Sequence, residues 1–176
     1  MKYGIDSNSE FAILEFKNSL YSILKNFEYK KIIFLCIGTD KVTGDCLGPL
    51  VGYKLSRLPL PNNVTILGNL DNPVHANNLR ENIKWIYENE KDSLIVAIDA
   101  SLGREEYINF ITIGEGGIRP GAGVKKNLPY VGDLYIAGVV NKIGAISTLQ
   151  STRLSVVMKM ADIISSGIWH CLNLLS

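Results

Sequence analysis

Short apolar runs alternate along the chain with segments in which apolar residues recur at helical spacing. Residues 32–37, 64–67, 94–98 and 134–140 are rich in β-branched and aliphatic residues. Continuous apolar runs of this length predict strands that are buried on both faces of a parallel sheet. Residues 107–113 alternate apolar and polar positions more clearly, so we expect a peripheral strand there, which could be antiparallel.

The segments around these strands predict helices at about 9–27, 49–58, 77–87 and from 147 onward. Strands that alternate with helices indicate an α/β protein: a three-layer α/β/α sandwich with a mostly parallel (mixed) central sheet. We expect one domain over residues 1–176. The positions expected on the buried side of the first and last helices are Phe11, Leu14, Leu20, Ile23, Leu24, Phe27, Leu154, Val157, Met160, Ile164 and Ile168.

Composition narrows the class of protein. The 176 residues are 47% hydrophobic and 20% charged with a net charge of +1, which favours a globular chain and gives no general attraction for nucleic acid. No stretch approaches the roughly 20 apolar residues of a membrane span, and the N-terminus lacks a signal-peptide pattern. The three cysteines follow no zinc spacing, so we expect a reduced, cytoplasmic compartment. The sequence does not specify an oligomeric state.

Two aspartates follow separate strands. Asp45 lies in the glycine-rich loop 38–49 after the first run, and Asp99 directly follows the run 94–98. In α/β sheets ligands bind beyond the carboxyl ends of the strands, so we expect both residues in one crevice. Two carboxylates there would share a proton, giving one acid and one base able to activate water for amide hydrolysis. With a third ligand such as His75, the same pair could hold a divalent metal.

Each aspartate also has an alternative role. Asp45 stands just before a helix, where aspartate often caps the helix N-terminus, and Asp99 could cap or be solvated. Cys46 could act as a nucleophile only if its pKa were lowered. The loop 38–48 lacks both the Lys-Ser/Thr of a phosphate-binding loop and the glycine spacing of a dinucleotide site.

Four further residues are candidates to support or bind a substrate. Thr39 and Gly44 lie in the loop that holds Asp45, and glycines there would let a substrate backbone approach. His75 lies between a strand and a helix and could point into the crevice, or it could simply begin the helix. Glu115 lies in the glycine-rich stretch 114–124 and could add a third carboxylate.

Four segments resemble known spore proteins. Residues 42–49, Val-Thr-Gly-Asp-Cys-Leu-Gly-Pro, are similar to Val-Thr-Pro-Asp-Ala-Leu-Gly-Pro of the spore germination protease. Residues 96–100 and 117–124 are similar to its second acidic strand end and its glycine-rich loop. Residues 72–79, Asn-Pro-Val-His-Ala-Asn-Asn-Leu, are similar to a stretch of the shorter spore protease YyaC family, which this chain resembles more closely.

The resemblance implies a phosphorylase/hydrolase-like fold, shared with hydrogenase maturation proteases. It implies an atypical aspartic endopeptidase of sporulation or germination, without cofactor, whose catalytic residues carry over to Asp45 and Asp99. Its substrates would be small acid-soluble spore proteins in the forespore or spore core. Hydrogenase maturation proteases bind metal through a Glu, an Asp and a later His, and residues 114–124 contain no histidine. The alternative is a non-catalytic homologue that binds a peptide or protein partner in the same crevice, favoured by the shorter chain and by Gly44 and Cys46 in place of proline and alanine.

Overall fold

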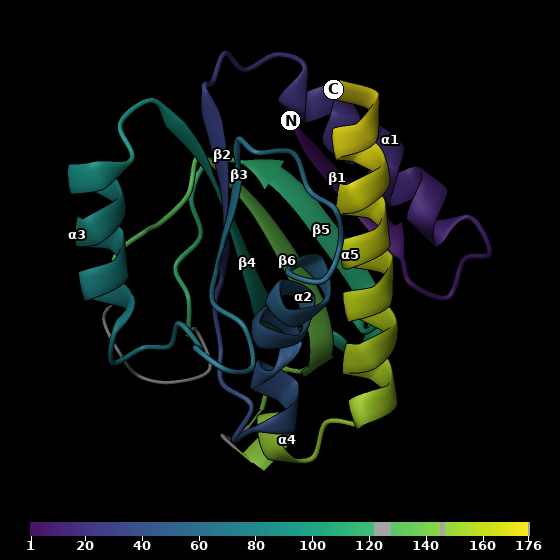
Figure 1. Ribbon diagram of the computed structural model, residues 1–176. Coiled ribbons are helices and arrows are strands. Elements are labelled where there is room, and N and C mark those ends of the chain that lie inside the picture. The colour runs from purple at the N-terminus through teal and green to yellow at the C-terminus, as the bar shows by residue number, and fades with distance from the viewer. Residues whose placement is uncertain (122–127, 145–146, 176) are drawn as a thin grey trace.

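A computed structural model describes residues 1–121, 128–144 and 147–175 (Figure 1). The elements in chain order are β1 (Lys2–Asp6), α1 (Ala12–Leu24), β2 (Lys31–Cys36), the 3₁₀ turn η1 (Thr43–Asp45), α2 (Leu47–Leu55), β3 (Val64–Leu67), α3 (Leu79–Asn89), β4 (Ser93–Gly103), the 3₁₀ turn η2 (Glu105–Tyr107), β5 (Phe110–Glu115), β6 (Leu134–Lys142), α4 (Ser147–Gln150) and α5 (Leu154–Leu175).

The strands form one six-stranded sheet in the order β1-β5-β6-β4-β2-β3. The pairs β2–β3, β2–β4 and β4–β6 are parallel, whereas β5 is antiparallel to both β1 and β6. Helices cover the sheet from two sides, α3 on one and α1, α2 and α5 on the other (Figure 1). The predicted three-layer fold with a mixed, mostly parallel sheet is confirmed.

Alternation along the strands divides the apolar residues between two cores. Leu94, Val96 and Ile98 of β4 pack into the larger core beneath α1, α2 and α5. Ile95 and Ala97 face the smaller core, beneath α3 and the segment after β5. Asp99 continues the second series, so its side chain belongs to the face covered by α3.

Several boundaries differ from those predicted. The strand β4 extends five residues beyond 98, because β6 pairs with it as far as Gly103. The strand β1 was not predicted, since its five residues include a glycine and gain their partner only from β5. Pairing with β1 also places β5 inside the sheet rather than at its edge.

The helices also begin and end differently. A bend over residues 151–153 divides the predicted last helix into α4 and α5. Phe11 is 63% exposed because it precedes the first turn of α1, and Leu154 is 56% exposed at the start of α5. Leu14 is also exposed, so these three assignments to the core were wrong. In the part of the chain that is described, no helix has the length and apolarity of a membrane span.

Candidate active site

The sheet topology places a switch point between the carboxyl ends of β2 and β4, and this region is called the crevice below. The two parallel strands pair from Lys31 and Ser93 to Cys36 and Ile98, after which β2 ends and β4 continues. The chain leaves β2 toward α2 on one face, whereas α3, which leads into β4, covers the other face. Such a change of direction between neighbouring strands is where open α/β sheets bind ligands.

Asp99 lies one residue beyond the last β2 partner and is only 5% exposed. Its Oδ1 accepts a hydrogen bond from the Ala100 N–H at 2.9 Å, and its Oδ2 accepts one from the Gly121 N–H at 3.4 Å. Within the sheet, Asp99 of β4 pairs with Ala137 of β6. A carboxyl group is therefore held deep in the crevice, inside a strand rather than at a helix cap.

Asp45 lies on the turn η1, which contacts β4, and it is near enough for its charge to act on Asp99. Gly38, at φ 142°, lets the chain turn sharply after β2, and the Thr39 N–H donates to the Asp45 carbonyl oxygen at 3.0 Å. A Cβ on Gly38 would meet that same oxygen at 2.0 Å, so a side chain cannot fit there. The N-cap of α2 is Cys46 and has no side-chain cap bond, so Asp45 is not the helix cap considered above.

The two carboxyl groups have strongly perturbed acidities. Burial raises the pKa of Asp45 to about 6, against the opposing effect of the Thr39 N–H. Burial, and then the negative charge of Asp45, raise the pKa of Asp99 well above its usual range, against the N–H groups of Ala100 and Gly121. Both carboxyl groups therefore hold a proton more readily than a free aspartate does, and at Asp99 the charge of Asp45 adds to this preference.

A resident metal does not fit this set of residues. The described residues contain no group of three or more His, Cys, Asp and Glu side chains arranged to hold an ion, so Asp45, Asp99 and His75 do not form the triad considered from the sequence. We derive no step through a metal.

The glycines beside Asp45 are closely packed on the side where a Cβ would lie. A Cβ on Gly44 would lie 2.7 Å from the Leu149 carbonyl oxygen, and one on Gly48 would lie 2.1 Å from the Ile37 carbonyl oxygen. Both glycines are needed because protein backbone already occupies the space next to them. The role of Gly44 beside a substrate backbone stays a prediction. Thr39 is next to the crevice, and its hydroxyl accepts the Lys41 N–H at 3.3 Å.

His75 lies beside the crevice but is not grouped with the aspartates. The preceding residue, Val74, bridges to Ile37, and its carbonyl oxygen accepts the Gly38 N–H at 2.8 Å. The ring Nδ1 of His75 accepts the Asn77 N–H at 3.3 Å, which leaves Nε2 to carry the proton of the neutral ring. His75 lines a polar groove of about 490 Å³ between β3 and α3.

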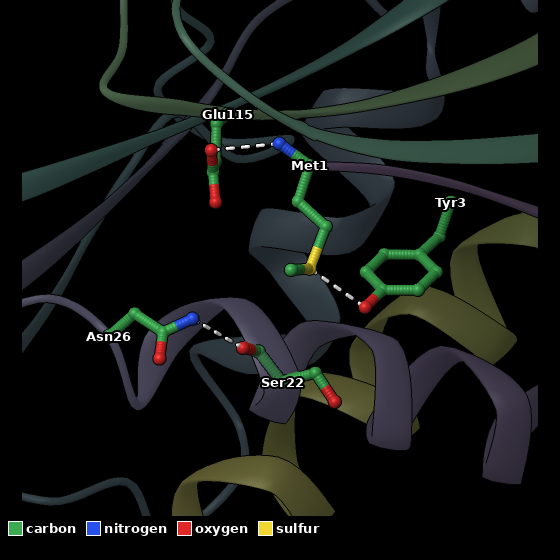
Figure 2. Close-up of polar contacts among 5 residues, drawn as sticks. All are labelled: Met1, Tyr3, Ser22, Asn26 and Glu115. Carbon is green, nitrogen blue, oxygen red and sulfur yellow. Dashed lines mark hydrogen bonds and ion pairs between the residues drawn. The ribbon is translucent and has the colours of Figure 1, made fainter.

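Glu115 lies toward the end of the strands opposite to the crevice. Its strand, β5, is antiparallel to β6, and Glu115 pairs with Leu134 of β6. Leu134 also pairs with Val96 of β4, which lies three residues before Asp99. Three residues of strand span roughly 10 Å. Figure 2 shows its carboxylate facing the Met1 amino group, with which it forms an ion pair of 2.8 Å. The expectation of a third carboxylate in the crevice is therefore corrected.

The glycine-rich stretch after β5 returns to the crevice nevertheless. Ile118 and Val131 pair as an antiparallel bridge, and Arg119 lies over the ring of Tyr130 at 5.0 Å. This excursion packs on the α3 face and brings the Gly121 N–H to Asp99. Residues 122–124 of the predicted loop lie outside the described residues.

Cys46 has the wrong acidity for a nucleophile. Its side chain is buried, and burial together with the charges of Asp40 and Asp45 raises its thiol pKa. A thiolate is the reactive form, so the neighbourhood disfavours cysteine chemistry.

A larger hollow, about 730 Å³, lies at the amino ends of β2 and β3, far from the aspartates.

Comparison with known proteins assigns the family. Residues 4–167 match the family described as "Protein of unknown function (DUF1256)". The chain belongs to this family. It is 41% identical over 170 residues to "Uncharacterized protein YyaC" of Bacillus subtilis (strain 168), covering 96% of this chain and 82% of that protein.

One solved structure defines the fold relationship. A [NiFe] hydrogenase maturation protease, HycI from Thermococcus kodakarensis KOD1, superposes with a TM-score of 0.56 over 88% of this chain and 99% of that one. The identity is 16%, so the comparison establishes a shared fold. The DUF1256 chain thus has a protease-like fold, as the sequence predicted.

Proposed function

We propose that this DUF1256 protein is a peptide-bond hydrolase in which Asp45 and Asp99 form an aspartic-type pair. The observation that carries the proposal is the burial of Asp99 in the crevice where the charge of Asp45 raises its pKa. Pairs of carboxyl groups whose environments separate their acidities are the usual source of one acid and one base. The protease-like fold supports the same assignment.

The acidities also assign the two roles. Asp45, with a pKa of about 6, is ionised at neutral pH and accepts a proton from the attacking water. Asp99 keeps its proton and donates it toward the scissile amide as the tetrahedral intermediate collapses. The N–H groups of Ala100 and Gly121 hold the Asp99 carboxyl in place for that transfer. We further propose that the substrates are small acid-soluble spore proteins, which the resemblance to the germination protease suggests.

The test is cleavage of a small acid-soluble spore protein by the purified full chain, with products identified by mass spectrometry. Asp45→Asn and Asp99→Asn are expected to lose about 100-fold or more of the rate, the usual contribution of a general acid or base. Asp40→Asn is the matched control, because Asp40 is an exposed carboxylate in the same loop. Thermal melts would verify that each variant folds.

The outcomes separate the two hypotheses for this crevice. Undiminished cleavage by either paired variant would remove the pair from the mechanism. Stoichiometric capture of the spore protein without cleavage would favour the non-catalytic binder. Neither binding nor cleavage of this substrate or of a peptide library would refute both.

A further inference from the structure

A buried polar cluster lies behind the turn that carries Asp45. Thr152, between α4 and α5, is 6% exposed, and its Oγ1 donates to the Thr148 carbonyl oxygen at 3.0 Å. The Nδ2 of Asn141, in β6, donates to the same carbonyl oxygen at 3.0 Å and to Thr152 Oγ1 at 3.2 Å. The three residues form a closed triangle of hydrogen bonds.

One side of this triangle touches the turn η1 directly. A Cβ placed on Gly44 would lie 2.8 Å from Thr152 Oγ1, so only a glycine backbone can approach this closely. Gly44 is covalently linked to Asp45. The Thr152 hydroxyl, together with the Leu149 backbone, therefore limits how far back the turn, and with it the Asp45 carboxyl group, can move.

The other side of the triangle belongs to the sheet that holds Asp99. Asn141 pairs with Leu102 of β4. Leu102 lies three residues after Asp99, just beyond a shift in the register between β4 and β6. Its Oδ1 accepts the Lys142 N–H at 2.8 Å, which limits rotation of the amide. The contacts thus run without a break from the strand of one aspartate to the turn of the other.

We propose that Asn141 and Thr152 are positioning residues that hold the Asp45 carboxyl group at a fixed separation from Asp99. The two residues are called the Asn141–Thr152 brace below. The role in catalysis rests on the proposed function, whereas the geometric role does not. Coulomb interaction between two carboxyl groups falls with their separation, and a displacement of about 1 Å can reduce a rate about 100-fold.

The first test is the titration of Asp45, followed by NMR of its side-chain carboxyl carbon in the full chain. Thr152→Val keeps the shape but removes the hydroxyl, and is expected to move the titration midpoint by roughly half a unit or more. Thr152→Ser restores the hydroxyl and is expected to restore the midpoint. The titratable groups Asp40, Cys46 and Asp99, which lie near the turn, are unchanged in these variants.

Ser151→Ala is the matched control. The Ser151 Oγ also donates to the Thr148 carbonyl oxygen, at 3.1 Å, but Ser151 is exposed and is not among the closest neighbours of Gly44. We expect no shift in this variant. If Thr152→Val does not fold, Asn141→Ala removes the other end of the brace and is read in the same way.

The second test is the pH dependence of cleavage. A positioning role predicts that Thr152→Val lowers kcat about 10-fold or more at little change in KM, with displaced limbs of the pH–rate profile. An Asp45 titration identical to wild type in Thr152→Val and Asn141→Ala would overturn the brace, even in an active enzyme. A shifted titration in a protein that cleaves nothing would keep the brace and refute the proposed function.

Discussion

Replacement of Asp45 by asparagine tests the electrostatics of the crevice without any substrate. Folding raises the pKa of Asp45 from 3.8 to about 6, chiefly through burial. The folded state then binds the proton more tightly than the unfolded state, so the free energy of unfolding falls as pH rises between those two values. A shift of about 2 units corresponds to about 3 kcal/mol of lost stability once the pH is above both.

Asparagine has nearly the same shape and is neutral at every pH. The stability of Asp45→Asn minus that of wild type is therefore expected to be near zero at pH 3.5 and to grow to about 3 kcal/mol at pH 8. For a domain of this size that difference raises Tm by roughly 6–12 °C. Urea unfolding at half-unit steps of pH, followed by circular dichroism, would measure the curve.

The control is again Asp40→Asn, an exposed carboxylate in the same loop, for which the difference from wild type should stay flat across the same pH range. A variant that is less stable than wild type at pH 8, or a difference that does not change with pH, would refute the conclusion that burial governs the charge of Asp45. A more stable but inactive variant would be the expected trade-off between stability and function.

Three further outcomes follow from the site. The rate of cleavage should show a bell-shaped pH profile, rising near pH 6 as Asp45 ionises and falling at higher pH as Asp99 loses its proton; a profile without an acid limb would contradict the roles assigned. Gly48→Ala should cost roughly 3 kcal/mol in urea unfolding, because its Cβ would meet the Ile37 carbonyl oxygen at 2.1 Å, and an unchanged midpoint would disprove this contact. Cys46→Ala should cleave within about twofold of wild type, and a large loss would restore cysteine chemistry as a candidate.

Local patterns were sufficient for most of the fold. The β-branched runs predicted the central strands because residues buried on both faces leave a continuous apolar signal. The weak strand β1 left no such signal, since its partner β5 is about 100 residues away along the chain. Phe11 and Leu154 fit the helical period but lie where the helices begin, and periodicity cannot locate an end that is set by a neighbouring turn.

For the site, the sequence by itself predicted that two aspartates follow separate strands of one sheet and lie at the same edge, because the carboxyl ends of parallel strands share one edge. Only the tertiary structure decided how those residues differ. The depth of Asp99, the partial burial of Asp45 and the resulting order of their acidities depend on groups contributed by distant segments, such as Gly121. Only the packing separated Glu115 from the crevice, because an antiparallel strand reverses which end of it reaches that edge. The packing likewise brought Asn141 and Thr152 behind Gly44. This contact could not be predicted, because close packing between remote segments leaves no periodic pattern in a single sequence.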